Sequence, residues 1–340
     1  MEYPSVGIGI LNWNGKKFLE QFLDGLQHLT YPNYTIYVID NDSSDDSLWY
    51  VEAEHPAVKI IKTGENLGFA GGYNYAFARM PEIYVLMLNS DVDVTPGFLE
   101  PLVTLMEKDK TIAATQPKIL AYHQKNFFEH AGAAGGMMDF LGYSFCRGRI
   151  FDTIEKDENQ YKTGEVFWVS GACSLIRKSA FAEIGGMDTY FFMHFEEIDM
   201  CWRFLSKGYK NVYCNESAVY HVGGGTLAYN SPKKTYYNFR NNIIMSIRNA
   251  PAVYLLWWLP ARFFLDQLAV VKFLSARDFK NAWAVERAYG GVLRWFFGKH
   301  REIPPLKKSL QDIPVVLKKS IIWLYYIKKK KQFSKIKAHT

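Results

Sequence analysis

The chain has 340 residues, of which 49% are hydrophobic and 22% are charged, and this composition excludes a disordered protein. Its length indicates one large domain with an extension, or two domains. The net charge of +6 hides an asymmetry, because residues 1–230 carry a net −11 and residues 231–340 a net +17. An acidic body with a basic tail predicts an anionic partner for the tail, either nucleic acid or a membrane surface.

The N-terminal residues and the cysteines indicate the compartment. Residues 1–6 contain neither a basic segment nor a long apolar one, so we expect no secretory signal. The cysteines show no CxxC spacing, and we expect four reduced thiols in a cytosolic protein. They are Cys146, Cys173, Cys201 and Cys214.

Apolar strands and helical segments alternate through the first hundred residues. Such alternation predicts an α/β fold with a mostly parallel sheet, right-handed crossovers and flanking helices. The expected strands are residues 6–11, 34–39, 58–61 and 84–89. The expected helices are residues 16–29, a segment capped by Ser43 or Ser44 with Asp45 and Asp46 in its first turn, and a segment that follows a glycine-rich turn and ends at Met80.

The middle of the chain is less regular. We expect a domain boundary between residue 223 and about residue 235, which divides the chain into residues 1–230 and a helical, basic extension, residues 231–340. The expected elements before this boundary are strands at residues 166–170, 173–176, 212–214 and 219–221, and a helix within residues 191–206.

Asp91 and Asp93 directly follow the apolar strand 84–89 and precede a Thr-Pro-Gly turn. Carboxylates that leave a buried strand here lie on a loop at the carboxyl edge of the sheet, where open α/β sheets bind ligands. Carboxylate oxygens suit Mg²⁺ or Mn²⁺. His221, at the end of another expected strand, is a second candidate ligand, although a single strand-end histidine is usually structural.

Two further strand ends carry polar residues. Asp40 ends the second strand and is expected near Asn12 and Asn14, where a carboxylate can accept the ring N–H of uracil or thymine. The alternative is turn formation, since Asp and Asn often close loops with their own backbone. Asn66 and Gly68 begin a glycine-rich turn that enters a helix, where a phosphate is favoured.

A run of acidic residues opens the helix expected near residue 196. Acidic residues in a first turn often only cap a helix. On a helix, Glu196, Asp199 and Arg203 share one face, and Asp199 with Arg203 is a plausible internal ion pair. Glu197 points elsewhere and is free to act as a general base.

Seven motifs then occur in a specific order. Over about residues 4–248 this order resembles the family 2 inverting glycosyltransferases with the glycosyltransferase-A fold, most closely the rhamnosyltransferase-like branch that builds bacterial surface polysaccharides. The motifs are NWNG, VIDNDSSDDS, NLGFAGGYN, LNSDVDV, SGACSLIRKSAF, GGMDTYFFMHFEEIDMCWR and YHVGGGT.

The resemblance implies a role for each candidate residue. Glu197 corresponds to the catalytic aspartate of the family's Glu-Asp pair but is one methylene longer, so Glu196 and Glu197 both remain candidates for the base. The implied donor-binding residues are Asn12, Asn14, Asp40, Asn66, Gly68 and Asp91; those on the acceptor side are Gly171, Ala172, Asp188 and Glu196; the metal ligands are Asp93 and His221.

The implied reaction is inverting transfer of a sugar from a nucleoside-diphosphate sugar to a hydroxyl of a glycan or lipid-linked acceptor, with Mg²⁺ or Mn²⁺, in cell-surface polysaccharide synthesis. The donor is dTDP-rhamnose or a UDP-sugar, because uracil and thymine present the same groups to Asp40. Two alternatives are a sugar nucleotidyltransferase and a non-catalytic carbohydrate- or membrane-binding protein. The first is disfavoured because a glycine-rich loop does not follow the first strand.

The basic tail favours a membrane over nucleic acid, because its aromatic residues form apolar blocks beside lysines. Residues 250–274 are apolar but are interrupted by Pro260, Arg262 and Asp266, so no uncharged 18-residue span occurs. We therefore expect a cytoplasmic protein docked peripherally on the inner face of the cytoplasmic membrane. The alternative is that this segment packs on the catalytic domain or forms a homo-oligomer.

Overall fold

The computed structural model describes residues 3–130, 132–223, 231–298 and 307–336. Its helices are α1 (Lys16–Phe22), α2 (Ser47–Glu54), α3 (Gly68–Phe77), α4 (Leu99–Lys108), α5 (Lys178–Glu183), α6 (Glu196–Ser206), α7 (Pro232–Asn249), α8 (Ala252–Ser275) and α9 (Phe279–Phe297), with short turns η1 (Asp24–His28), η2 (Thr189–Phe191), η3 (Leu310–Asp312), η4 (Trp323–Ile327) and η5 (Phe333–Lys335). Its strands are β1 (Val6–Asn12), β2 (Tyr34–Asp40), β3 (Lys59–Lys62), β4 (Tyr84–Asn89), β5 (Val92–Val94), β6 (Ile112–Ala121), β7 (Gln124–Phe128), β8 (Gly136–Asp139), β9 (Ser144–Cys146), β10 (Arg149–Ile150), β11 (Thr153–Ile154), β12 (Gly164–Val166), β13 (Cys173–Arg177), β14 (Lys210–His221) and β15 (Val316–Leu317).

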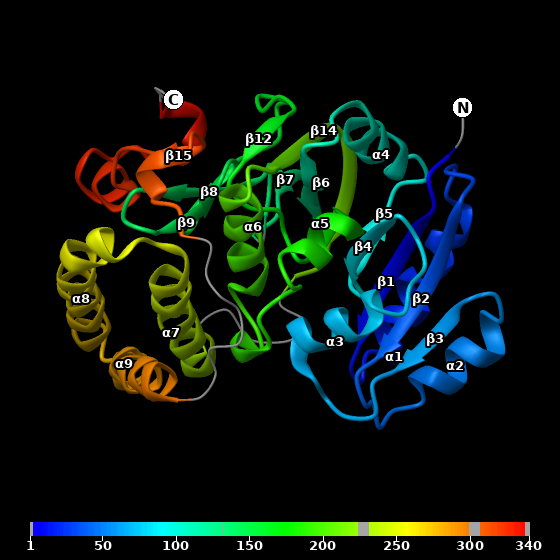
Figure 1. Cartoon of the computed structure of the whole chain (residues 1–340), viewed down its shortest axis with the longest axis horizontal. Coiled ribbons are helices and arrows are strands. Elements are labelled where there is room, and N and C mark those ends of the chain that lie inside the picture. The colour runs from blue at the N-terminus through cyan, green and yellow to red at the C-terminus, as the bar shows by residue number, and fades with distance from the viewer. Residues whose placement is uncertain (1–2, 131, 224–230, 299–306, 337–340) are drawn as a thin grey trace.

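The main sheet has the strand order β12-β14-β6-β13-β4-β1-β2-β3. Strands β4, β1, β2 and β3 run parallel, and β13 runs antiparallel between β4 and β6. Apolar side chains dominate β1 and β4, which are buried along almost their whole length, as expected for strands covered on both faces. The predicted α/β fold with a mostly parallel sheet and flanking helices is confirmed (Figure 1).

Several predicted elements differ from the structure. The two strands predicted at 212–214 and 219–221 are one strand, β14, because the polar residues between them form a bulge that shifts the register without ending the strand. Residues 167–170 are not in a strand, and the helix predicted at 16–29 ends at Phe22 and continues as η1. Neither Ser43 nor Ser44 caps α2, whose N-cap residue is Asp46.

A second sheet, which the sequence did not predict, has the order β11-β10-β9-β8-β15. Its edge strand β15 comes from near the C-terminus and pairs in parallel with β8. Asp139, at the end of β8, accepts hydrogen bonds from the backbone N–H groups of Leu141, Tyr143 and Ile321. The carboxylate therefore ties the C-terminal segment to the middle of the chain.

The hydrophobic core continues beyond the expected boundary at residue 230, which itself lies in residues 224–230, outside the described ranges. Ile243, Ile244 and Met245 of α7 are fully buried in the same cluster as Trp202 of α6. Helices α7, α8 and α9 form a group at the end of the molecule opposite β1, β2 and β3 (Figure 1). Helix α7 is thus the layer through which this group contacts the main sheet's helices.

The ion pair expected within α6 is confirmed. Nε of Arg203 donates to Oδ2 of Asp199 at 2.8 Å, and both side chains are almost completely buried. The Arg203 guanidinium also donates to the carbonyls of Ile184 and Gly186, and Nδ2 of Asn249 donates to the other Asp199 oxygen at 2.7 Å. These contacts join α6, the segment before it and the end of α7.

Replacing Arg203 should therefore destabilise the fold strongly. Arg203→Met leaves the Asp199 carboxylate buried without its cation, and we expect the free energy of unfolding to fall by about 3–5 kcal/mol. The matched control is Lys207→Met, which removes an exposed cation at the C-cap of α6, 3.3 Å from Glu183 of α5, and should cost no more than about 1 kcal/mol. Urea denaturation measures both, and equal losses would contradict this assignment.

Candidate active site

The carboxyl ends of β1 and β2 place Asn12 directly opposite Asp40. Both side chains are buried, and the Asp40 carboxylate accepts a hydrogen bond from the backbone N–H of Ser43 at 3.2 Å. Nδ2 of Asn12 donates to the hydroxyls of Ser43 and Ser47. Asn12 therefore holds the loop after β2 in the position that surrounds Asp40.

Asn14 orders the same loop from the other side. Its backbone is left-handed, with φ of 51°, and its side-chain oxygen accepts from the backbone N–H groups of Ser44 and Asp45. The two asparagines and Asp40, predicted to form a base-binding pocket, thus lie together. The serines expected to cap α2 instead bond to these asparagines.

Asn41, which the sequence analysis did not single out, connects this loop to the glycine-rich turn. Its Nδ2 donates to Oδ1 of Asn66, and its Oδ1 accepts from the backbone N–H of Leu67 at 2.9 Å. Oδ1 of Asn66 also accepts from the N–H of Gly68, where α3 begins. The position of Asn41 in the Asp40-Asn41-Asp42 run could have predicted this role, because Asn after a strand end often bonds to a neighbouring turn.

Phe192, in the segment before α6, contacts the turn at Asn66–Gly68. Gly68 has φ of +68°, and a Cβ there would lie 2.7 Å from the Phe192 ring, so the position requires glycine. The N–H of Phe69 donates to the Phe192 carbonyl at 3.0 Å, and a Cβ on Gly171 would lie 2.9 Å from the Phe69 ring. The Ala172 carbonyl accepts from Asn89 at the end of β4, so donor-side and acceptor-side candidates meet around Phe69.

His221 lies between two carboxylates rather than beside Asp93. Its Nε2 is 3.1 Å from Oδ1 of Asp91, and its Nδ1 is 3.2 Å from Oε2 of Glu129. Burial alone would lower the pKa of His221, but hydrogen bonds to Asp91 and Glu129 outweigh it and raise the pKa to about 10. Glu129 was not predicted, because neither its spacing nor its neighbours in the sequence relate it to Asp91.

Asp93 lies on the short strand β5, not on a loop as predicted, and is paired in register with Tyr220 of β14. Its carboxylate is half-buried and lies 3.9 Å from the Lys125 ammonium. Among the described residues no group of three His, Cys, Asp or Glu side chains is already arranged around a cation position. The chemistry of the donors nevertheless suits Mg²⁺ or Mn²⁺, because carboxylates and an imidazole are carried by the paired strands β5 and β14 and the turn before β5.

Glu196 and Glu197 open α6, as predicted. Burial raises the pKa of Glu196 well above its ordinary value, and the neighbouring Glu197 charge adds to this. Burial also raises the pKa of Glu197 to about 7. A carboxyl group with a pKa near neutrality has the property that a general base needs.

Asp188 is held within the protein. Its carboxylate accepts from the N–H of Tyr190 at 2.8 Å and pairs with the Arg248 guanidinium from α7. His194 lies between Asp188 and the α6 glutamates, and its Nε2 is buried with no hydrogen-bond partner among the described residues. Burial lowers the pKa of His194 to about 4, so the imidazole is neutral.

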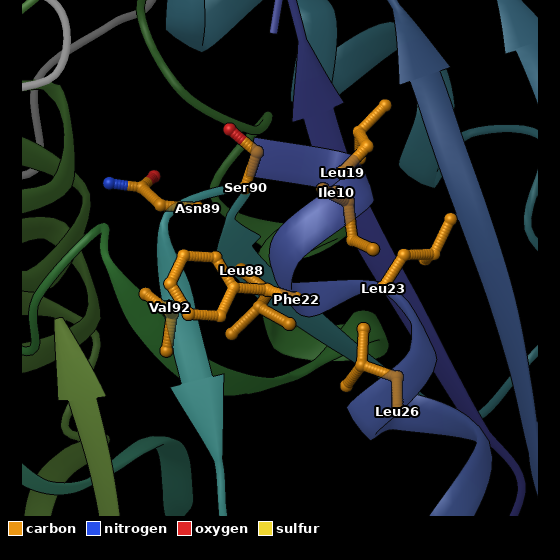
Figure 2. Close-up of a pocket in the computed structure, with 9 residues that line it drawn as sticks. All are labelled: Ile10, Leu19, Phe22, Leu23, Leu26, Leu88, Asn89, Ser90 and Val92. Carbon is orange, nitrogen blue, oxygen red and sulfur yellow. The ribbon is translucent and has the colours of Figure 1, made fainter. Parts of the chain in front are cut away.

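A small pocket lies beneath the end of β4 (Figure 2). It is lined chiefly by apolar side chains of β1, the α1 region and β4, such as Ile10, Phe22 and Leu88, with Asn89 and Ser90 at one side. This lining does not supply the polar groups that a nucleotide requires. The candidate site residues are instead the polar groups at the strand ends, Asp40 and Asp91, and at the start of α6, Glu197.

A match to a family model identifies the family of this chain. The model for glycosyl transferase family 2 matches residues 7–185, which hold most of the main sheet and the donor-side loops. The chain belongs to glycosyl transferase family 2. The predicted family is therefore confirmed.

Curated relatives of this family 2 chain include rhamnosyltransferases. An N-acetylglucosaminyl-diphospho-decaprenol L-rhamnosyltransferase of Mycobacterium tuberculosis is 27% identical over 219 residues, covering 60% of this chain and 71% of the relative. The rhamnosyltransferase WbbL of Escherichia coli is 27% identical over 205 residues, covering 58% of this chain and 74% of that protein. The predicted likeness to rhamnosyltransferases is therefore confirmed.

Solved structures confirm the glycosyltransferase-A fold. GalNAc-T7 with UDP, GalNAc and Mn²⁺ superposes with a TM-score of 0.60 and 16% identity, over 88% of this chain and 58% of that one. Residues 1–349 of Staphylococcus aureus TarS with UDP superpose with a TM-score of 0.52 and 13% identity, over 84% of this chain and 92% of that one. At these identities the likeness concerns the fold alone.

Proposed function

We propose that this family 2 glycosyltransferase moves a sugar, with inversion, from a dTDP- or UDP-sugar to a hydroxyl of a glycan or lipid-linked acceptor used in cell-surface polysaccharide synthesis. The observation that carries the proposal is the half-buried carboxyl group of Glu197, which has a pKa near 7 and follows a segment bonded through the Phe192 carbonyl to Phe69 beside the Asn66–Gly68 turn. The rhamnosyltransferase relatives, two of which are named above, support dTDP-rhamnose as the first donor to test.

In this proposal each group of residues performs one task. Asp40 accepts the ring N–H of the base, and the Asn66–Gly68 turn at the start of α3 receives the diphosphate. Glu197 removes the proton from the acceptor hydroxyl as it attacks the anomeric carbon from the face opposite the diphosphate. Direct displacement inverts that carbon, and a positioned base contributes ~10²–10⁴-fold to the rate.

Asp93, with Asp91 and His221, would hold a divalent cation, as the donor chemistry of this cluster allows. Such a cation supplies positive charge to the leaving nucleoside diphosphate. The solved structures of GalNAc-T7 and of the mannosyltransferase PcManGT, which superposes with a TM-score of 0.53 over 88% of this chain at 14% identity, contain Mn²⁺ with UDP and GDP-Man respectively.

The base assignment predicts a specific pH dependence. Glu197 must be deprotonated to act, so kcat/KM should fall about tenfold per pH unit below pH 7 and level off above it. Glu197→Gln keeps the size of the side chain but cannot accept the proton. We expect kcat to fall by ~10²-fold or more with nearly unchanged donor affinity, measured by initial rates and nucleotide binding.

The matched control for this assignment is Glu196→Gln. Glu196 lies beside Glu197 and is 4% exposed, so the same neutral substitution tests position rather than charge. We expect this variant to retain most of its turnover. If Glu196→Gln is inactive and Glu197→Gln is active, the roles are reversed.

The metal assignment predicts that EDTA stops sugar transfer and that Mg²⁺ or Mn²⁺ restores it. Asp93→Asn should raise the metal concentration that is needed for transfer. It should also reduce the metal-dependent increase in melting temperature with UDP or dTDP, because a more weakly bound ligand stabilises the folded protein less. Asp46→Asn, which alters an exposed carboxylate at the N-cap of α2, is the control. Full activity of Asp93→Asn in EDTA would exclude this metal site.

Helix α8 buries an ion pair and exposes most of its apolar residues. Arg262 and Asp266 are buried and paired at 2.8 Å, and they bond inward to Asn242 of α7 and Tyr289 of α9. No described helix is long and apolar enough to cross a membrane. Exposed large apolar side chains cover the outer faces of α8 and α9 and continue onto η4: Val253, Leu256, Phe263, Phe264, Leu268, Val271, Leu274, Phe279, Trp283, Leu293, Phe296, Phe297, Trp323 and Ile327.

This outer apolar surface, with the basic residues beside it, supports peripheral docking on an anionic membrane face where a lipid-linked acceptor is presented. Lys272 of α8 lies 3.5 Å from the hydroxyl of Tyr326, and Lys328–Lys331 follow η4 directly. Each basic residue near an anionic surface contributes about 1 kcal/mol. Inserted aromatic side chains add burial to this attraction.

Docking predicts co-flotation with phosphatidylglycerol vesicles at low salt, and release at high salt. Phe264→Glu should weaken binding by placing a charge on the outer face of α8, where Phe264 is 70% exposed. Trp49→Glu is the matched control, because Trp49 is 66% exposed but lies on α2 in the family 2 region. A full-length protein that ignores these vesicles would refute docking and leave the surface as an oligomer interface, which light scattering would detect.

A further inference from the structure

The segment before α6 has an unusual backbone. Phe192, His194 and Phe195 have φ angles of 60°, 65° and 73°, so three of the four residues from 192 to 195 have positive φ without being glycine. A Cβ makes this conformation unfavourable, and it persists only where the surroundings hold it. The turn formed by residues 191–195 leads directly into Glu196 and Glu197, so its conformation sets the start of α6.

Asn241, in the middle of α7, contacts this turn. Its side chain has no exposed surface, and Nδ2 lies 3.2 Å, 2.9 Å and 2.7 Å from the carbonyl oxygens of Phe191, Met193 and His194. The amide has two N–H groups, so three carbonyls of one turn share the two donors. A single buried amide thus satisfies a run of carbonyls that this backbone directs away from any helix or strand.

Arg240 supports the same contact. Its Nε donates to Oδ1 of Asn241 at 2.8 Å, which orients the amide so that Nδ2 faces the turn. Its guanidinium also donates to the carbonyls of Tyr190 and Phe191 and lies over the Tyr190 ring. Arg240 and Asn241 together therefore donate hydrogen bonds to the carbonyl of every residue from 190 to 194 except Phe192. The Phe192 carbonyl accepts from the N–H of Phe69 instead.

We propose that Asn241 is a positioning residue for sugar transfer: by holding the left-handed turn at 191–195, it fixes the direction in which Glu197 enters the site. This inference rests on the proposed role of Glu197 as the base. Asn241 does not reach the reacting atoms in this assignment. Misplacement of a reacting group by about 1 Å can cost ~10²-fold in rate, so loss of the hydrogen bonds should appear in turnover.

The neighbouring residue Asn242 supplies a closely matched control. It is also buried, accepts from Arg262 and donates to the Gly142 carbonyl, away from the turn. Asn→Asp at either position keeps the volume and the oxygen that accepts from arginine, and removes the N–H donors. The two variants therefore make the same chemical change, but only Asn241→Asp releases the turn.

The experiment measures both turnover and local exchange. Asn241→Asp should lower kcat by about tenfold or more while UDP or dTDP affinity stays within about threefold. Amide hydrogen exchange in residues 191–197, measured without substrates, should accelerate in Asn241→Asp and not in Asn242→Asp. The exchange measurement needs no sugar transfer, so an inactive wild-type protein would reject the proposed function while the turn is still tested.

Each remaining outcome decides the proposal. Wild-type kcat in Asn241→Asp, or a loss of kcat without faster exchange in the turn, would overturn it, as would an equal loss in Asn242→Asp. If Asn241→Asp does not fold, Arg240→Lys provides the test, because lysine keeps the charge but cannot reproduce the guanidinium contacts to Asn241, Tyr190 and Phe191. That variant should show the same pattern to a smaller extent, and wild-type turnover and exchange would refute the inference.

Discussion

The buried pair of Asp199 and Arg203 is the interaction on which the arrangement around α6 depends. A charge inside a protein requires compensation, and here the compensation comes from three parts of the chain. Arg203 reaches the carbonyls of Ile184 and Gly186, while Asn249 completes the bonding of Asp199. The family 2 core and the first helix of the basic region are consequently joined by polar contacts as well as by shared hydrophobic packing. These contacts also fix the position of Glu196 and Glu197 at the start of α6.

The polar residues proposed to bind the donor are arranged differently, because they bond mainly to one another and to their own loops. Asn12, Asn14 and Asn41 hold loops, whereas Asp40 keeps acceptor capacity beyond its single bond to Ser43. The negative charges of Asp91 and Glu129 are balanced by the His221 imidazolium between them. An incoming cation with its diphosphate would therefore exchange partners with groups already paired, which keeps this cluster compact in the absence of ligands.

Local patterns predicted much of the fold and site. Strands β1, β2 and β4 were recognisable because each is a continuous apolar run, and their ends located Asn12, Asp40 and Asp91. The spacing of Asp199 and Arg203 predicted their ion pair, since residues four apart share a helix face. Long-range contacts were not predictable in this way. Nothing near Glu129 or Asn241 in the sequence shows that they meet His221 or the turn at 191–195.

Two further failures also have physical causes. The strands of the second sheet have only two to four residues each, too few for an alternating pattern to emerge. Helix α8 combines buried charges with exposed apolar residues, and periodicity alone does not say which face of a helix is inside. The bulge in β14 places polar residues within a strand, where they resemble a loop.

The pairing of β15 with β8 has a consequence for how the chain is made. Ile321 and Asp139 are 182 residues apart, so a nascent chain exposes the edge of β8 until residues 316–321 have been synthesised. An unpaired strand edge can pair with another chain. A nascent chain that stops before residue 316 therefore keeps an open edge on β8 that chaperones would need to cover.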